Sequence, residues 1–499
     1  MLNPRNLLRG LSAITMAIGV VLALPTTIAV IYAEYGAVLG FAAPMVILTS
    51  VGFIAYRILG FPVKLTHVEA IVISSIGWLL AAAYSSIPYI VVLGVNFVDA
   101  YFEAISSLTT TGMTILQTLE EVPKSILLWR ALGEWIGGAG IILLTTLLIL
   151  SREGIIAWRL YVSEARDERL APTIKDTIRR IWLIYVFYTA VCALALMFLG
   201  LNSFDAICHA LACLSTGGFS TKTSNVGAFN SAAVEIVLVL FMVMGAIRFS
   251  LHHRLFTGGL REFVKDFELR AFIAILAIAS LVISLDLAIS SGSSFIEAFR
   301  IGFFHAISVG TTTGFTTKDL TVFPPLSKVV FLTLMIVGGC LNSTAGGLKV
   351  WRFMALLSVS RYEVERLFLP PGAVRSLKVG GRILGEDEIL RVATIFFIYV
   401  LFALIATAAM VSFEGNFLES LSAVLSAMAT VGPFYGSPIS LSLESKVVLI
   451  ISMWAGRLEL IHAFLLFTPK LWRREHRHLA ELSNSLSLRG RLSKMILGF

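Results

Sequence analysis

Four short polar phrases recur along an otherwise apolar chain, and their residue types are those of oxygen ligands. They read AISSLTTTGMT (104–114), LACLSTGGFST (211–221), AISVGTTTGFT (306–316) and LSAMATVGPFYG (425–436). Carbonyl oxygens of such backbone, helped by threonine hydroxyls, can replace the water shell of a dehydrated monovalent cation. Glycine permits the backbone angles that aim successive carbonyls at one ligand, and it adds no side chain to block the way.

The backbone at 109–113, 215–219, 311–315 and 429–433 is therefore the candidate ion-binding site. Its predicted ligands are Thr109, Thr110, Thr111, Gly112, Ser215, Thr216, Gly217, Gly218, Thr311, Thr312, Thr313, Gly314, Ala429, Thr430, Val431 and Gly432. An alternative is that each Thr-Gly run is only a close-packing patch between membrane helices, where small residues are common. Four copies in one register favour the ion site over this alternative.

Each phrase follows an acidic residue at a regular distance. The interval from acid to glycine is thirteen residues in three copies, and seventeen in the third, which is one extra helical turn. The acids are Asp99, Asp205, Glu297 and Glu419. An acid in the first turn of a short helix complements its positive end, so the negative end points at the loop. Non-helical backbone at membrane depth is tolerated only where protein buries it or a wet cavity adjoins it.

The elements that carry these loops are predicted to be membrane helices. Hydrophobic residues make up 57% of the chain, charged residues 14%, and the mean hydropathy is +0.88, which indicates an integral membrane protein. Apolar runs long enough to cross a bilayer lie at 11–33, 38–60, 68–94, 126–150, 181–200, 231–250, 270–290, 328–341, 391–412 and 446–469. The first follows Arg5 and Arg9, and its length favours a retained helix over a signal peptide.

The glycines of the four phrases are spaced 106, 96 and 118 residues apart, with one apolar run before each copy and one after it. This period predicts an all-α membrane protein with four pseudo-repeated helix, pore-helix, loop, helix units around a central pore, plus two N-terminal transmembrane helices. The expected parts are 1–66 (two N-terminal helices), 67–177, 178–268, 269–388 and 389–469 (repeats 1 to 4), and 470–499 (a cytoplasmic tail).

The basic residues indicate orientation. With the N-terminus in the cytoplasm, the predicted inside segments hold 31 of the 39 Lys and Arg residues, as the positive-inside rule requires. Ten spans then place both termini in the cytoplasm. The net charge of +8 is explained by this topology, and nothing further supports a nucleic-acid partner.

Enzymatic chemistry finds no support in the sequence. The chain shows no Ser/His, paired-Asp or HExxH arrangement, and GGCLNSTAGGLK lacks the spacing of a phosphate-binding loop. An intramembrane enzyme or a scaffold without transport is therefore disfavoured. Cys192, Cys208, Cys213 and Cys340 show no metal spacing and are expected in the packed core. Structural pairing is expected for the intramembrane polar residues Glu134, Arg248, Arg300 and His305.

A glycine-rich polar break interrupts the eighth apolar run and is a poor helix interior, because each glycine costs up to ~1 kcal/mol relative to alanine there. Its residues are Gly338, Gly339, Asn342, Ser343, Thr344, Gly346 and Gly347. A polar break at this depth is expected to face the conduction path and to restrict it. The alternative is a simple kink packed against a neighbouring helix.

The last apolar run, in the phrase WAGRLELIH, contains Arg457. An arginine at a membrane-helix centre costs about 2.5–3.5 kcal/mol on insertion, so it normally faces protein or water. We expect it to project into the pore. The alternatives are an ion pair with Glu459 or Glu134, or a side chain that reaches the cytoplasmic interface.

Together these phrases resemble the Trk/Ktr/HKT superfamily of potassium transporters, over nearly the whole chain. WIGGAGIILL (135–144) and MIVGGCLNSTAGGLKVWRF (335–353) match further family pieces, and two extra N-terminal helices favour the TrkH/TrkG branch. The resemblance implies potassium uptake across the cell membrane with potassium as the bound ion. It also implies a gating loop formed by the glycine-rich break beneath the filter, and a pore arginine at Arg457.

The same resemblance implies a homodimer with a cytoplasmic, nucleotide-binding regulatory subunit of the TrkA type. The basic segments 152–180 and 349–391 are candidate contacts for that subunit, although such segments also bind anionic membrane lipid. Two residues depart from the pattern: Pro433 follows the fourth glycine, and Gly217 stands in place of a threonine. We therefore expect loops that are not strictly equivalent. A sodium-permeable or sodium-coupled transporter of the same fold is the rival function.

Overall fold

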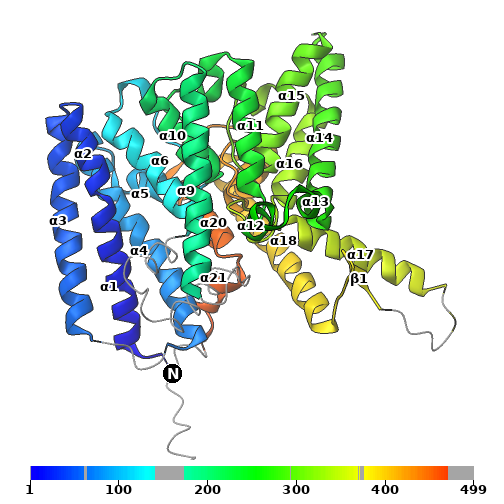
Figure 1. The fold of residues 1–499 in the computed structure, drawn as a ribbon, viewed down its shortest axis with the longest axis horizontal. Helices are drawn as coiled ribbons and strands as arrows, with labels where there is room; N and C mark the ends of the chain where they lie inside the picture. The colour runs from blue at the N-terminus through cyan, green and yellow to red at the C-terminus, as the bar shows by residue number, and fades with distance from the viewer. Residues whose placement is uncertain are drawn as a thin grey trace, which may run out of the picture.

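The computed structural model describes residues 2–60, 65–140, 174–292, 294–368, 370 and 376–469. These residues form an array of helices with one short β-hairpin (Figure 1). Within the described ranges, six segments are long and apolar enough to cross a membrane. They are α1 with α2 (Pro4–Val21 and Ala23–Ile31), α3 (Tyr35–Ile58), α4 (His67–Leu93), α9 (Ile174–Phe198), α14 (Phe267–Ser291) and α18 (Glu386–Glu414). The chain is a multi-pass, all-α membrane protein.

The N-terminal helices form a flank of their own, at the left of Figure 1. Helices α1 and α3 pack closely because glycines lie in their interface; a Cβ on Gly52 would lie 2.6 Å from the backbone nitrogen of Met16. The carboxylate of Glu34, before α3, accepts hydrogen bonds from the backbone N–H groups of Lys124 (2.6 Å) and Ser125 (3.0 Å). It thereby caps helix α6 and attaches the flank to the rest of the molecule.

Four short helices precede the four polar phrases, as predicted. They are α5 (Phe97–Leu108), α10 (Ser203–Leu214), α15 (Phe295–Gly310) and α19 (Phe417–Met428). Each begins after an N-cap side chain that accepts a hydrogen bond from the backbone N–H of the acid three residues later. The caps are Asn96, Asn202, Ser294 and Asn416. The predicted acids therefore lie in the first helical turn, where they complement the positive helix end.

Beyond each polar phrase the chain forms a 3₁₀ turn and then a second apolar helix. The turns are η1 (Leu119–Glu121), η3 (Asn225–Phe229), η4 (Leu320–Val322) and η5 (Pro438–Ser440). The second helices are α6 (Lys124–Ala139), α11 (Ala232–Ala246), α16 (Pro325–Val337) and α20 (Leu443–Arg457). Each stops short of the length that a membrane span requires.

The continuous spans expected at 231–250 and 446–469 were wrong, whereas the break predicted at Gly338 within the run 328–341 is present. Helix α11 ends and the chain turns by 102° into α12 (Phe249–Gly258). Helix α16 ends in a loop at 338–349, and α20 is followed by two residues with positive φ before α21 (Ile461–Leu465). Of the expected span 126–150, the part beyond residue 140 lies outside the described residues.

The physical reason for one of these breaks is visible in the backbone hydrogen bonds. The last carbonyls of α11, at Gly245 and Ala246, accept from the backbone N–H groups of Thr344 (3.3 Å) and Cys340 (3.0 Å). Both donors belong to the 338–349 loop of another repeat. A continuing helical turn would need the same carbonyls, so α11 ends where this loop docks. Hydropathy counts only side chains and does not detect such a break.

The remaining described elements are two helices and a short hairpin. They are α13 (Leu260–Lys265), α17 (Val350–Arg366), and the antiparallel strands β1 (Lys378–Val379) and β2 (Arg382–Ile383). Helix α17 and the hairpin extend away from the other helices at the lower right of Figure 1. The four cysteines are buried and unbridged, as expected for core packing.

Candidate functional site

The four polar loops, here called loop 1 (109–113), loop 2 (215–219), loop 3 (311–315) and loop 4 (429–433), meet in a closed ring. The glycine of each loop lies against the carbonyl oxygen of the residue before the glycine of the next loop, and a Cβ there would come nearer than the 3.0 Å that real Cβ atoms keep. The pairs are Gly112 with Gly217, Gly218 with Thr313, Gly314 with Val431, and Gly432 with Thr111. The order 1, 2, 3, 4 and back to 1 brings all four predicted phrases together.

The loop backbone has the same unusual conformation in every copy. The threonine two residues before each glycine has positive φ: 59° at Thr110, 55° at Thr216, 56° at Thr312 and 54° at Thr430. This region costs an L-residue about 1–2 kcal/mol and is rare for a β-branched one. Strain of this kind persists only where the surroundings enforce it, and it is concentrated at functional sites.

The loop N–H groups point back to the helix from which each loop emerges. In loop 1, Thr110 donates to the carbonyl of Ser107 (3.0 Å) and Thr111 to that of Ser106 (2.8 Å), and the other loops repeat this pattern. The carbonyls of Thr110 and Thr111 accept no hydrogen bond from any described residue, and neither do their counterparts in loops 2 to 4. Buried carbonyls normally have a partner, so these free oxygens are the candidate ligands of the predicted ion site.

The hydroxyls of the loops are used differently. Thr109 donates to the carbonyl of Ile105 (2.7 Å) and Thr311 to that of Ile307 (2.7 Å), and each hydroxyl also lies 2.8 Å from the hydroxyl of the threonine two residues on. Ser215 donates to Leu211 at 2.8 Å. These side chains stabilise the end of the short helix. The carbonyl oxygens of the ring, and not these hydroxyls, are therefore the groups left without a partner among the described residues.

The 338–349 loop lies directly against one side of this ring. Its Gly346 N–H donates to the Thr312 hydroxyl (2.8 Å), and the Thr216 hydroxyl donates to that of Thr344 (3.2 Å). A Cβ on Gly346 would overlap the Ala429 carbonyl and the Thr430 hydroxyl. The loop therefore contacts loops 2, 3 and 4 through the same threonine positions that have positive φ.

The other residues of the predicted gating break shape this loop. Gly338 and Gly347 have φ of 69° and 76° and lie so close that a Cβ on Gly347 would be 2.7 Å from the Gly338 Cα. Gly339 packs beside Ala345 and Ala246. Asn342 has φ of 55°, and the Ser343 hydroxyl donates to the Cys340 carbonyl at 2.6 Å. These contacts close the break into a compact turn, which a simple helix kink would not produce.

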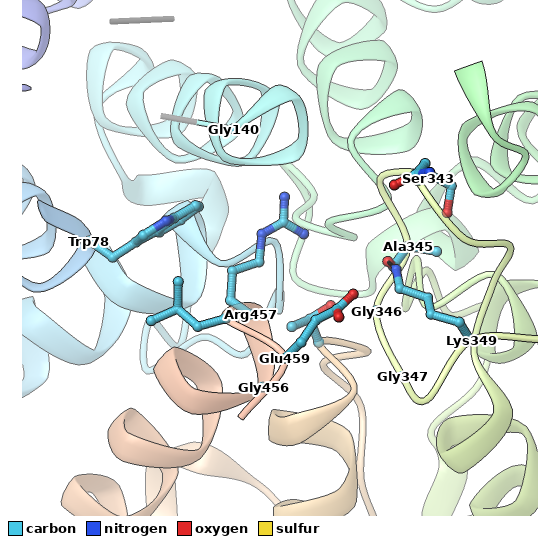
Figure 2. A pocket seen from close by; sticks show the side chains of 13 residues that line it. Trp78, Gly140, Ser343, Ala345, Gly346, Gly347, Lys349, Gly456, Arg457 and Glu459 are labelled. Atoms are coloured by element: carbon cyan, nitrogen blue, oxygen red, sulfur yellow. Dashed lines mark hydrogen bonds between the residues drawn. The ribbon is translucent and has the colours of Figure 1, made fainter. Parts of the chain in front are cut away.

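Arg457, at the end of α20, completes the contact with the ring. Its guanidinium donates to the Thr110 hydroxyl (3.4 Å), the Thr344 carbonyl (3.1 Å), and the Gly138 carbonyl (3.3 Å). It also donates to the Gly137 carbonyl and lies 5.6 Å from the centre of the Trp78 ring. Figure 2 shows the side chain pointing between the end of α6, at Gly140, and the loop that carries Ser343 and Ala345. A fixed positive charge thus lies beside loop 1.

The two acids that were the alternative partners of Arg457, Glu459 and Glu134, make other contacts. Glu459 forms an ion pair with Arg352 of α17, and Glu134 accepts hydrogen bonds from the Phe219 N–H at 3.1 and 3.3 Å. The space around Arg457 is a cavity of about 50 Å³ whose lining includes Asn342, Gly346 and Thr430.

A set of positioning residues was only partly recognised from the sequence, which named His305 as structurally paired but did not single out Glu103 and His209. Nine residues before the loop glycine stand Glu103, His209 and His305, all buried, and each holds the outer part of its own loop. Glu103 accepts from the Ile115 N–H (3.0 Å), His209 Nε2 lies 2.9 Å from the Ser220 hydroxyl, and His305 Nε2 lies 3.0 Å from the Lys318 carbonyl. Their fixed offset from the glycine was the signal that could have found them. Repeat 4 has Ala423 there.

The pairing expected for two other intramembrane arginines is confirmed. Arg300 makes a bidentate pair with Glu235 of α11, at 2.8 and 2.7 Å, and Arg248 pairs with Asp266. Neither arginine contacts the ring. Across the described residues no cluster of three or more His, Cys, Asp or Glu side chains could hold a metal ion.

Comparison with known proteins places this geometry among transporters. The family model TrkH, described as a cation transport protein, matches residues 64–474. The chain is 33% identical over 488 residues to the Trk system potassium uptake protein TrkH of Vibrio parahaemolyticus, covering 94% of this chain and 99% of that one. It is 34% identical over 417 residues to TrkH of Escherichia coli K12, covering 81% and 86%. An uncharacterized cation transporter of Methanocaldococcus jannaschii is 32% identical, covering 93% and 95%.

A solved structure is similar over the same length. The crystal structure of the potassium transporter TrkH from Vibrio parahaemolyticus superposes with a TM-score of 0.85 at 31% sequence identity, covering 94% of this chain and 99% of that one.

Proposed function

Because the chain belongs to the TrkH family of cation transport proteins, we propose that it takes up potassium through the ring of loops 1 to 4. The observation that carries the proposal is the closed sequence of glycine-to-carbonyl contacts around that ring. Its relatives are named potassium uptake proteins. The chain is accordingly a transporter and not an enzyme.

The proposed filter works by exchanging water for carbonyl oxygens. Two carbonyls from each loop, at the positive-φ threonine and the residue after it, have no hydrogen-bond donor among the described residues. Such carbonyls can replace the hydration shell of a potassium ion. The C-terminal, negative ends of α5, α10, α15 and α19 adjoin the same loops and favour a cation there.

Passage below the filter is proposed to be controlled by the 338–349 loop and Arg457. The loop contacts loops 2, 3 and 4, and Arg457 joins the Thr110 hydroxyl of loop 1 to the Thr344 carbonyl. A potassium ion leaving the ring on this side meets a positive charge and a backbone obstruction. For the ion to pass, the loop must move, and its hydrogen bonds to the ring must break.

The assembly in the membrane is proposed on the same basis. Both termini lie in the cytoplasm, the chain forms a homodimer in the cell membrane, and a TrkA-like nucleotide-binding subunit docks on the cytoplasmic face. The parts of the chain are the N-terminal pair, four repeats and the tail, with the boundaries predicted from the sequence. Of the two basic segments that are candidate contacts, 349–391 includes α17 and the hairpin. Most of the other, residues 152–173 of 152–180, lies outside the described residues, and so does the tail from 470.

Tracer rubidium uptake into proteoliposomes of the purified chain, driven by an internal potassium load, tests this function. We expect uptake that external potassium blocks and sodium blocks little. Equal block by both ions would instead assign a looser, sodium-permeable pathway, to which the Pro433 and Gly217 departures would contribute. No uptake by folded protein, with and without an added TrkA-type subunit, would contradict transport by this ring.

Replacing Arg457 with alanine is expected to raise rubidium uptake several-fold, because the change removes a positive charge and the link between loop 1 and the 338–349 loop. The same flux assay measures it. Lys446→Ala is the matched control, since Lys446 is a cation on the same helix that pairs with Asp99 at 2.7 Å, away from the ring. If the Arg457→Ala variant took up rubidium at the wild-type rate, Arg457 would have no role in gating.

A further inference from the structure

Glu134 of α6 is a completely buried carboxylate that reaches into loop 2. Its two oxygens accept from the Phe219 N–H at 3.1 and 3.3 Å, and its exposed fraction is 0%. A Cβ on Gly217 would lie 2.6 Å from Oε2 of Glu134. At the position of Gly217 the other loops carry Thr111, Thr313 and Val431. In loop 2, therefore, a carboxylate from another repeat fills the space that a side chain of the loop fills elsewhere.

A second buried pair holds the outer ends of loops 1 and 2 beside this carboxylate. Arg130 Nε donates to Glu103 Oε1 at 2.7 Å, and both side chains are 1% exposed. The guanidinium donates to the Ser220 carbonyl at 3.1 Å and lies 3.9 Å from the centre of the Phe219 ring. Glu103 accepts from the Ile115 N–H at 3.0 Å. When ionised, Glu103, Arg130 and Glu134 together carry a net charge of −1.

When Glu134 is ionised, this excess negative charge attracts a compensating cation. A buried charge is tolerated only when it is paired or coordinates an ion, and Arg130 makes its direct ion pair with Glu103. The ring adjoins Glu134, because the Gly217 carbonyl lies at the junction with Gly112 of loop 1. A cation among the ring carbonyls at this junction would be attracted by an ionised Glu134.

The charge is particular to the first repeat. In three repeats a glycine of the second helix packs against the last carbonyl of the short helix: Gly137, Gly245 and Gly456. The residues three positions earlier are Glu134, Met242 and Met453. Both methionines are buried apolar side chains. The carboxylate is therefore not a general packing requirement of this position.

We propose that Glu134, accommodated by Gly217 and positioned beside the Arg130–Glu103 pair, sets the affinity of the ring for monovalent cations at the junction of loops 1 and 2. The inference rests on the proposed transport function and adds a specificity-determining residue to it. The carboxylate acts through space on the bound ion and does not have to ligate it.

The variant Glu134→Gln tests this role, because glutamine keeps the size and the carbonyl acceptor for Phe219 N–H but removes the charge. We expect the KM for rubidium uptake to rise about tenfold, as loss of one nearby charge in a partly dehydrated site predicts, with the maximal rate changed less than about twofold. Glu134→Asp, which keeps the charge, is expected to stay closer to the wild-type KM than the glutamine variant.

Glu235→Gln is the matched control, since it neutralises another buried acid of a second helix, one that pairs with Arg300 away from the ring. Its KM should equal that of the wild type. An unchanged KM in Glu134→Gln, or a reduced maximal rate with unchanged KM, would overturn the proposal.

A second variant and the wild-type measurement make each outcome interpretable. If Glu134→Gln does not fold, the double variant Glu134→Ala/Gly217→Thr supplies an uncharged site whose space is filled as in loops 1 and 3, and the same rise in KM is expected. A wild-type KM in that variant overturns the proposal. If wild-type protein takes up no rubidium, with and without an added TrkA-type subunit, the transport function fails; if it does and the variants match it, only the role of Glu134 fails.

Discussion

Alanine at position 314 is expected to abolish the preference of the pathway for potassium over sodium and to lower rubidium uptake at least about tenfold. The added Cβ would overlap the Val431 carbonyl and lie 2.8 Å from Cδ of Pro433, so loops 3 and 4 would have to separate. Gly314 also has φ of 81°, a conformation that costs alanine about 1–2 kcal/mol. Displacing one carbonyl spoils the geometry that distinguishes ions.

The measurement is rubidium uptake with competing sodium or potassium, which reports selectivity separately from rate. Gly94→Ala is the matched control, because Gly94 has a similar φ of 68° at the end of α4 but no atom within 4 Å of its virtual Cβ. The Gly94→Ala variant therefore has the unfavourable backbone conformation but no steric overlap. If Gly314→Ala retained the wild-type ratio of potassium to sodium block, the ring would not be the selective element.

Deleting residues 342–345 is expected to raise passive rubidium efflux from loaded proteoliposomes at least about tenfold. The deletion removes Thr344, whose hydroxyl donates to the Gly245 carbonyl (2.8 Å) and whose carbonyl accepts from Arg457 (3.1 Å). It also shortens the turn that holds Gly346 against loops 3 and 4. Without these contacts, neither the 338–349 loop nor Arg457 is held in place beneath the ring.

A graded substitution separates this mechanism from general damage. Thr344→Val removes the hydroxyl at almost constant volume and should increase efflux several-fold, less than the deletion. Thr333→Val is the matched control, since that hydroxyl bonds only within α16, to the Val329 carbonyl at 3.0 Å. Efflux at the wild-type level in the deletion variant, with the protein folded, would show that the 338–349 loop does not close the pathway.

The sequence alone was sufficient for the membrane class, the helix periodicity and the register of the four loops. These features depend on signals within a few residues: apolar runs, an acid in the first helical turn, and a glycine at a fixed distance. The short helices begin directly after Asn96, Asn202, Ser294 and Asn416, because each of these side chains caps its own helix. The glycine-rich break was recognisable for the same reason, since glycine and asparagine are poor in a helix interior.

Only the tertiary structure decided which of these segments meet. Hydropathy predicted continuous second helices, but α11 ends because its carbonyls bond Cys340 and Thr344, about a hundred residues away. The partners of Arg457 could not be chosen from sequence, because its guanidinium donates to the backbone carbonyls of Gly137 and Thr344, whereas Glu459 pairs with Arg352. The sequence indicated only that Gly217 lacks a threonine hydroxyl. The structure shows that Glu134 occupies the space that a side chain at position 217 would fill. Such contacts arise when four units close into a ring, and no local propensity encodes that closure.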